Sequence, residues 1–177
     1  MNQILTDAQS LHDEIITNRR TIHQFAEIGF DLPQTYAYIF NKLTEYGYQP
    51  KKVGKMGITC LAGKPGRTIL LRADMDALPM AEESGESFAA VNGHCHSCGH
   101  DCHSAMLLGA AKLLKQRENE LHGTVKFMFQ PAEETFEGAK DMLANGVLEG
   151  VDAALAYHVG PGRMPVGLFM YNSGKTM

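Results

Sequence analysis

The sequence contains no tryptophan and no excess of positive charge. Its 177 residues carry 16 lysines and arginines against 20 aspartates and glutamates, which gives a formal net charge of −4. Because the basic residues are scattered along the chain, they provide no positive field that would attract nucleic acid or anionic lipid. We therefore expect neither of these as a partner.

Long apolar runs are also absent from the sequence. No segment approaches the roughly 20 apolar residues that cross a bilayer. Residues 1–7 lack the charged and apolar regions of a secretory signal. We therefore expect a cytoplasmic protein without a membrane partner. The 44% apolar and 20% charged residues are typical of one globular domain with one core.

Cysteine is scarce and unevenly placed. Three of the four cysteines lie in residues 93–103, together with four histidines and Asp101, whereas Cys60 stands alone in an apolar stretch. Bunched thiols and imidazoles fit a metal site in a reducing compartment better than a disulfide framework. Thiolate, imidazole and carboxylate are ligands of first-row metals, and glycines let such a segment fold around an ion. The segment therefore predicts a metal site.

Other interpretations of this segment stay open. Cys95 and Cys98 form a C-x-x-C pair, which is also typical of redox sites and of half a structural zinc site. With Cys102 they could serve an iron–sulfur cluster, and the histidines could belong to a surface loop. A structural zinc site usually draws a second ligand pair from further along the chain, and Cys60 does not supply one. We therefore favour a catalytic metal site.

Apolar periodicity predicts alternating helices and strands. Thr6 and Gln9 resemble a capping box at the start of a first helix, which ends before Gly29, and Pro33 begins a second helix, which ends at Gly47. Further helices are predicted at 104–115 and 139–144, and strands at 48–53, 58–62, 68–72, 125–129 and 153–157. This order predicts a three-layer α/β/α fold with a mostly parallel mixed sheet.

Two of the predicted strands, 68–72 and 153–157, are almost entirely apolar. Such composition is expected when both faces of a strand are buried. His12 and His23 fall on the first predicted helix without a clustered partner. We expect both to be ordinary surface or packed histidines rather than metal ligands.

Acids and a histidine follow three predicted strands. Asp74 and Asp76 follow one strand, Glu133 and Glu134 follow a second, and His158 follows a third. Ligands of open α/β sheets bind at the carboxyl ends of the strands, so together with the His/Cys segment these residues predict a two-metal hydrolytic site. Taken alone, the glutamates could equally begin a helix, and the aspartates could serve a turn.

Four segments carry a more specific signal. They are residues 71–79 (LRADMDALP), residues 98–111 (CGHDCHSAMLLGAA), residues 130–134 (QPAEE), and His158 followed by residues 165–167 (PVG). In this order they resemble the amidohydrolase branch of the M20 metallopeptidases, which includes hippurate hydrolases, indole-acetyl-amino-acid hydrolases and N-acetyl-diaminopimelate deacetylases. The resemblance covers essentially the whole chain.

The resemblance implies two divalent metal ions, which could be zinc, manganese, cobalt or nickel. The implied ligands are Cys98, which bridges the ions, and His100, Glu134 and His158. Glu133 resembles the general base that takes a proton from the water activated by the metal. Asp76 resembles the acid at the strand end that orients a ligand.

The implied activity is cleavage of the amide bond of N-acyl amino acids, which are small-molecule substrates. Cys95 and Cys102 depart from the family, where methionine and glycine or alanine are more usual. Family members also have longer chains, so the resemblance implies that residues 1–177 are the N-terminal portion of the catalytic domain. The lid and dimerisation domain and the C-terminal part, with a final histidine ligand, are then absent. The alternative is a truncated, catalytically inactive metal-binding fragment, and a homodimer is a further expectation.

Overall fold

The computed structural model describes residues 3–160, 162, 165 and 167–170. The helices are α1 (Gln3–Ser10), α2 (His12–Phe25), α3 (Pro33–Glu45), α4 (His100–Gln116) and α5 (Gly138–Ala144), with a 3-10 turn η1 (Glu118–Glu120). The strands are β1 (Lys51–Val53), β2 (Gly57–Gly63), β3 (Thr68–Asp74), β4 (Thr124–Gln130) and β5 (Ala153–Ala156). No helix among these residues is both long and apolar enough to cross a membrane.

The strands form one sheet in the order β1-β2-β4-β3-β5. Strand β3 pairs in parallel with β4 and β5, while β2 pairs in antiparallel fashion with β4 and β1. Strand β1 therefore runs in the same direction as β3, β4 and β5, and only β2 is reversed. The prediction of a mostly parallel mixed sheet is confirmed.

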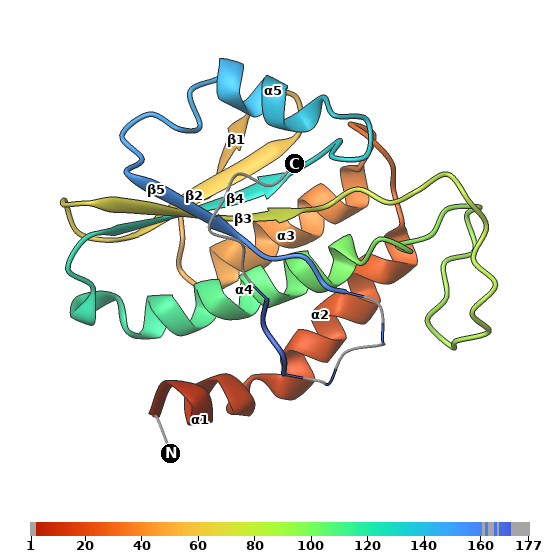
Figure 1. Cartoon of the computed structure of the whole chain (residues 1–177), viewed down its shortest axis with the longest axis horizontal. Coiled ribbons are helices and arrows are strands. Elements are labelled where there is room, and N and C mark those ends of the chain that lie inside the picture. Colours follow the sequence, from red (N-terminus) through yellow and green to blue (C-terminus); the bar gives the residue numbers. More distant parts are fainter. Residues whose placement is uncertain (1–2, 161, 163–164, 166, 171–177) are drawn as a thin grey trace.

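Helices cover both faces of the sheet, with α5 on one side and α2, α3 and α4 on the other (Figure 1). Strand β4 shows how the sequence produces these layers, because successive side chains of a strand point to opposite faces. Its Phe127 and Phe129 lie in the core beside α4, whereas Met128 packs with Met142 of α5. The predicted α/β/α layering is confirmed.

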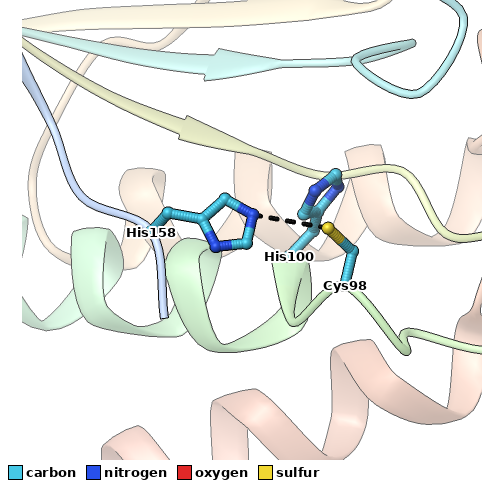
Figure 2. A group of neighbouring side chains, drawn as sticks. All are labelled: Cys98, His100 and His158. Carbon is cyan, nitrogen blue, oxygen red and sulfur yellow. Dashed lines mark hydrogen bonds between the residues drawn. The ribbon is translucent and has the colours of Figure 1, made fainter. Parts of the chain in front are cut away.

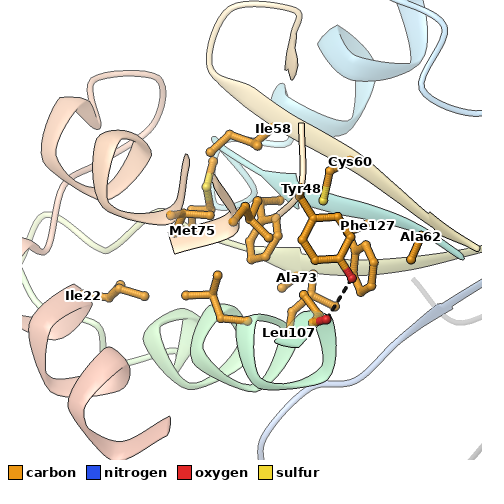
Figure 3. Close-up of a cluster of buried hydrophobic side chains, with 14 of the residues drawn as sticks. Ile22, Tyr48, Ile58, Cys60, Ala62, Ala73, Met75, Leu107 and Phe127 are labelled. Atoms are coloured by element: carbon orange, nitrogen blue, oxygen red, sulfur yellow. Dashed lines mark hydrogen bonds between the residues drawn. The ribbon is translucent and has the colours of Figure 1, made fainter. Parts of the chain in front are cut away.

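The larger core lies between the sheet and α4 (Figure 3). Tyr48 packs edge-on against Phe127, with ring centroids 5.5 Å apart, and its hydroxyl donates a hydrogen bond of 2.8 Å to the Ala111 carbonyl. A buried phenol thereby keeps a partner for its polar atom. This core fixes α4 against the strands whose ends carry the predicted site.

Helix α4 begins four residues earlier than the predicted span of 104–115. The residue before it, Gly99, has φ of 90°, and an added Cβ would lie 2.4 Å from Cγ2 of Val159. Only glycine fits both the positive φ and the close approach. The early start places His100 and His103 on the helix itself, one turn apart.

The first predicted helix is wrong in its continuity and in its start. The helical segment begins at Gln3, so Thr6 lies inside α1 and does not cap it. The helix is interrupted at Leu11, where φ is −90° and ψ is 1°. The Ser10 hydroxyl donates to the Asp7 carbonyl at 2.6 Å, which closes α1 with a tight turn. The change of direction lets Leu11 be buried while α1 lies on the surface.

The prediction that strands 68–72 and 153–157 are buried on both faces is also wrong. All four residues of β5 are exposed, and Ile69 in β3 is 38% exposed, although Leu70 is buried. Strand β5 lies at the edge of the sheet, and β3 is its neighbour. An apolar sequence is compatible with burial, but what packs over a strand decides whether it is buried.

Candidate metal centre

The predicted site residues meet at the carboxyl ends of β3, β4 and β5, beside the first turn of α4. Three groups each have potential ligand atoms within 4.8 Å of one another: Cys98, His100 and His158; His100, Glu133 and Glu134; and Asp74, His100 and His103. His100 belongs to all three groups, so it lies at the centre of the site. The topology explains this convergence, because parallel strands end at the same edge of a sheet.

His100 is oriented by a backbone carbonyl. Its Nδ1–H donates to the Asp76 carbonyl at 2.8 Å, and the side chain is fully buried. The other ring nitrogen, Nε2, is buried without a hydrogen-bond partner, at 3.7 Å from both Oε2 of Glu133 and Oε1 of Glu134. A histidine that donates through Nδ1 and leaves Nε2 free is arranged as a metal ligand.

His158 is exposed, and its ring points toward Cys98, which lies beside His100 (Figure 2). Its Nδ1–H donates to the Val159 carbonyl at 2.7 Å. The unprotonated Nε2 accepts a hydrogen bond from the Cys98 thiol at 3.3 Å. A cation between the sulfur and this nitrogen would take the place of the thiol proton.

Asp76 holds the segment that carries the two glutamates. Its buried carboxylate accepts the backbone N–H of Glu133 at 3.0 Å and that of Glu134 at 3.1 Å. The segment is a turn in which Ala132 has a positive φ of 50°, so the alternative that the glutamates begin a helix is wrong. Gly138 lets the turn close, because an added Cβ would lie 1.6 Å from the Pro131 carbonyl oxygen.

The two glutamates differ in their surroundings. The Glu134 side chain is 24% exposed and its Oε1 is buried without a hydrogen-bond partner, whereas the Glu133 side chain is 32% exposed. Glu134 also lies close enough to Cys98 to influence its thiol. Glu134 therefore faces the thiol and the imidazole together, while Glu133 lies more open to solvent.

The acids around the site shift several pKa values. Burial, followed by the nearby carboxylate of Glu134, raises the pKa of the Cys98 thiol to about 11. Burial alone would raise the pKa of Asp74, but the hydrogen bond from His103 and the charge of Arg72 outweigh it and lower this pKa to about 2. The site thus places acidic side chains around a thiol whose raised pKa keeps it protonated at neutral pH.

These residues fit divalent metal ions. The buried Nε2 of His100 and Oε1 of Glu134 are polar atoms without partners, and such atoms carry a free-energy cost that a ligand would remove. A thiol, two imidazoles and a carboxylate form a donor set for first-row metals. A bound cation would also favour the thiolate of Cys98, against the burial and the nearby carboxylates that raise the pKa of this thiol.

Asp74 and His103 enter the site without a role assigned from the sequence. Asp74 is buried at the end of β3, where its Oδ2 lies 2.6 Å from Nη1 of Arg72. His103 is buried beside it. The spacing of three residues after His100 on a helix could have indicated that His103 shares its face.

The remaining cysteines lie outside the three groups. Cys95 and Cys102 belong to none of them, and all four cysteines are free. Cys95 instead exchanges backbone hydrogen bonds with Leu78. The structure therefore joins Cys98 to His100 and His158, not to the other half of its C-x-x-C pair.

A second polar cluster, missed by the sequence reasoning, lies beside the site. His23 of α2 is buried between two acids, with Nδ1 2.7 Å from Asp101 and Nε2 3.0 Å from Glu82. Nε of Arg19 lies 2.7 Å from the same Asp101 oxygen. His23 is buried, as expected for a packed histidine, but its partners were not foreseen.

Comparison with known proteins adds a family match. Residues 70–174 match the model of peptidase family M20/M25/M40. The chain is 40% identical over 152 residues to an N-acyl-L-amino acid amidohydrolase of Geobacillus stearothermophilus, covering 82% of this chain and 41% of that protein. It is 40% identical over 174 residues to an N-acetylcysteine deacetylase of Bacillus subtilis, covering 96% of this chain and 46% of that protein.

Solved structures show the same likeness. A putative aminohydrolase from methicillin resistant Staphylococcus aureus superposes with a TM-score of 0.86 at 41% identity, covering 90% of this chain and 42% of that one. A Bacillus subtilis protein, described as a dinuclear metal binding peptidase from the M20 family, superposes with a TM-score of 0.83 at 41% identity. It is covered over 44% of its length, and this chain over 87%. The chain thus spans less than half the length of each of these four proteins.

Proposed function

This chain belongs to peptidase family M20/M25/M40, and from that membership we propose that it carries the metal centre of an amidohydrolase that cleaves the amide bond of N-acyl amino acids. The names of two relatives, an N-acyl-L-amino acid amidohydrolase and an N-acetylcysteine deacetylase, support the substrate class. One observation carries the proposal for this chain. His100 and His158 each donate their Nδ1–H to a backbone carbonyl and point Nε2 toward other proposed ligands.

In this proposal two divalent ions are held by four side chains, and zinc, manganese, cobalt and nickel all suit these donors. The ligands are Cys98, His100, Glu134 and His158. Bound ions would lower the pKa of water and polarise the carbonyl of the scissile amide.

The glutamates divide ligand and base between them. Glu134 is proposed as the ligand because its Oε1 is buried without a partner and faces Nε2 of His100 at 3.7 Å. Glu133 is proposed as the general base because its carboxylate is the more exposed of the two and can exchange protons with water and substrate. Glu133 would take a proton from the attacking water and give it to the leaving amine when the amide bond breaks.

Asp76 supports both functions without a proposed contact to substrate. Its carbonyl fixes the ring of His100, and its carboxylate fixes the backbone of both glutamates. We therefore propose Asp76 as a positioning residue. Acids and carbonyls behind metal ligands typically set ligand orientation in this way.

Metal binding and hydrolysis need separate tests, because the chain spans less than half the length of its relatives. The alternative to an active enzyme is a metal-binding fragment without turnover. A reducing compartment such as the cytoplasm is part of the proposal, since the four thiols are free.

The test is a cobalt(II) titration of the whole chain, followed by absorption spectroscopy, with hydrolysis of N-acetyl amino acids assayed on the loaded protein. We expect a thiolate-to-cobalt charge-transfer band that is lost in Cys98→Ala, and weaker binding in His158→Ala. Cys95→Ala and His122→Ala are the matched controls, because Cys95 and His122 lie outside the ligand groups. Full retention of metal in both ligand variants would refute the proposed centre. Binding without turnover would favour the fragment alternative.

A further inference from the structure

His103 uses both of its ring nitrogens within the protein. Its Nδ1 lies 2.5 Å from Oδ1 of Asp74, and its Nε2 lies 2.9 Å from the backbone nitrogen of Val159. A backbone N–H can only donate, so Nε2 is the acceptor and the ring proton is on Nδ1, where it is donated to Asp74. The neutral ring is therefore fixed in one tautomer and one orientation.

This bonding argues against a ligand role for His103. Ligand atoms of Asp74, His100 and His103 do lie within 4.8 Å of one another, as a third metal position would require. Yet neither nitrogen of His103 has a lone pair free for a metal, in contrast to Nε2 of His100, which is buried without a partner. The ring is also buried, which limits any rotation that would free Nε2.

The hydrogen bond to Val159 connects His103 to His158, the proposed metal ligand that precedes Val159 in the sequence. The two backbone polar groups of Val159 are both engaged, since its N–H donates to His103 and its carbonyl accepts from Nδ1 of His158. The rings of His103 and His158 also pack edge to face, with centroids 4.5 Å apart. The side chain of Val159 fills the space above Gly99.

The other end of this connection is anchored in the sheet. Asp74 ends β3, and its carboxylate is paired with Arg72. The hydroxyl of Ser104 donates to the Asp74 carbonyl at 2.8 Å, which ties the same residue to α4. Asp74 and His103 thus link the end of β3 to the exposed segment after β5.

We infer that His103 is a positioning residue: by holding Val159 it directs Nε2 of His158 toward the Cys98 thiol, and it is not itself a metal ligand. This inference rests on the proposed function for the ligand role of His158. It adds His103 to the residues that metal binding needs besides the ligands themselves. His158 is exposed and follows an edge strand, so it needs an anchor to keep its orientation.

Two substitutions separate the halves of the connection. In His103→Asn the amide nitrogen can replace Nδ1 as donor to Asp74, but no acceptor reaches Val159. In His103→Gln the amide oxygen can replace Nε2 as acceptor, while the donor to Asp74 is lost. We expect His103→Asn to weaken cobalt binding by about tenfold or more, as for other residues that orient metal ligands, and His103→Gln to retain more affinity. Both should keep the wild-type number of bound ions.

A double-substitution cycle tests whether His103 acts through His158. In the His158→Ala background, His103→Asn should cause no further loss of affinity. A further loss equal to the one that His103→Asn causes in the wild-type background would overturn the inference, because it would show an effect that does not pass through His158. Loss of one bound ion, with the Cys98 charge-transfer band intact, would overturn it as well by making His103 a ligand.

A metal-free measurement keeps this inference separate from the proposed function. Imidazole nitrogen NMR of the metal-free chain should show His103 protonated at Nδ1 only, and the Val159 amide should be protected from hydrogen exchange. His103→Asn should remove that protection while far-UV circular dichroism stays unchanged. A wild-type chain that shows this protection but binds no cobalt would refute the proposed function alone. An unprotected Val159 amide in the wild-type chain would refute the inference.

Discussion

His100 and Asp76 are joined by a hydrogen bond of 2.8 Å from the imidazole Nδ1–H to the Asp76 backbone carbonyl. The carboxylate of the same Asp76 accepts the backbone N–H groups of Glu133 and Glu134. One buried residue at the end of β3 therefore sets the positions of three groups that come from α4 and from the turn after β4.

Asp76→Asn should loosen this arrangement. The amide keeps one acceptor oxygen but turns an NH₂ group toward a backbone donor, so one glutamate N–H loses its partner. These donors are partly buried, so leaving one unsatisfied should cost up to about 1–3 kcal/mol of unfolding free energy, and disturbed ligand orientation should lower metal affinity by about 10–100-fold. Urea unfolding and cobalt titration measure the two effects.

The matched control for this substitution is Asp152→Asn. Asp152 also accepts a backbone N–H, from Thr68 at 2.7 Å, but it is exposed and lies at the opposite end of β3. We expect it to leave metal affinity unchanged. Equal losses of affinity in the two variants would contradict the role given to Asp76.

The neighbouring glutamates should respond differently to the same change. In a protein with measurable turnover, Glu133→Gln should keep its metal and lose on the order of 10²-fold or more in rate, as for removal of a general base. Glu134→Gln should lose metal affinity first, because its buried Oε1 faces His100. Metal analysis and hydrolysis rates of both variants decide the assignment. Loss of metal in Glu133→Gln with retention in Glu134→Gln would show that the two roles are reversed.

The sequence was sufficient for those parts of the site that follow from local pattern and topology. Asp76, Glu133 and His158 each follow a predicted strand, and parallel strands bring their carboxyl ends to one edge. Convergence of these residues therefore needed no knowledge of side-chain contacts. The start of α4 was not among these parts, because the helix was predicted to begin only at residue 104 and it begins at His100.

Other features depend on contacts that leave no periodic trace. The partners of His23 lie 78 and 59 residues away along the chain, at Asp101 and Glu82. The tautomer of His103 depends on one backbone N–H of Val159. The exposure of β5 depends on its place at the sheet edge, which its four apolar residues do not encode.

The cluster around His23 predicts a pH-dependent contribution to stability. The hydrogen bond to Asp101 is the largest cause that raises the pKa of His23 above 6.5, and the one to Glu82 adds to it, against the effect of burial. A raised pKa means that the stabilisation is complete below pH 6.5 and is lost as pH rises through the folded-state value. Breaking a buried ion pair costs about 3–5 kcal/mol, so His23→Gln should destabilise the chain strongly below pH 6.5 and much less at alkaline pH.

Urea unfolding of the wild-type chain and of His23→Gln, from acid to alkaline pH, measures the difference in unfolding free energy. On the acid side the contribution of His23 should persist well below pH 6.5, because Glu82 stays ionised there. Burial raises the pKa of Glu82, but hydrogen bonds from Ser84 and His23 outweigh burial and lower this pKa to about 2. His12→Gln is the control, because His12 lies on the same helix with an exposed partner, Asp13. A His23→Gln effect that is independent of pH would show that His23 contributes packing rather than charge.

The exposed edge of the sheet predicts self-association. Within the described part of the chain, β5 has β3 as its only neighbour, and Leu155 and Ile69 are 42% and 38% exposed. An unpaired edge with apolar side chains favours pairing with a second strand. Sedimentation velocity should therefore show concentration-dependent dimers, which Leu155→Lys abolishes by placing a charge on the edge. Leu61→Lys is the control, because Leu61 is 57% exposed but lies on the interior strand β2. Equal loss of dimers in both variants would indicate general apolar association, and a monomer at every concentration would exclude the edge as an interface.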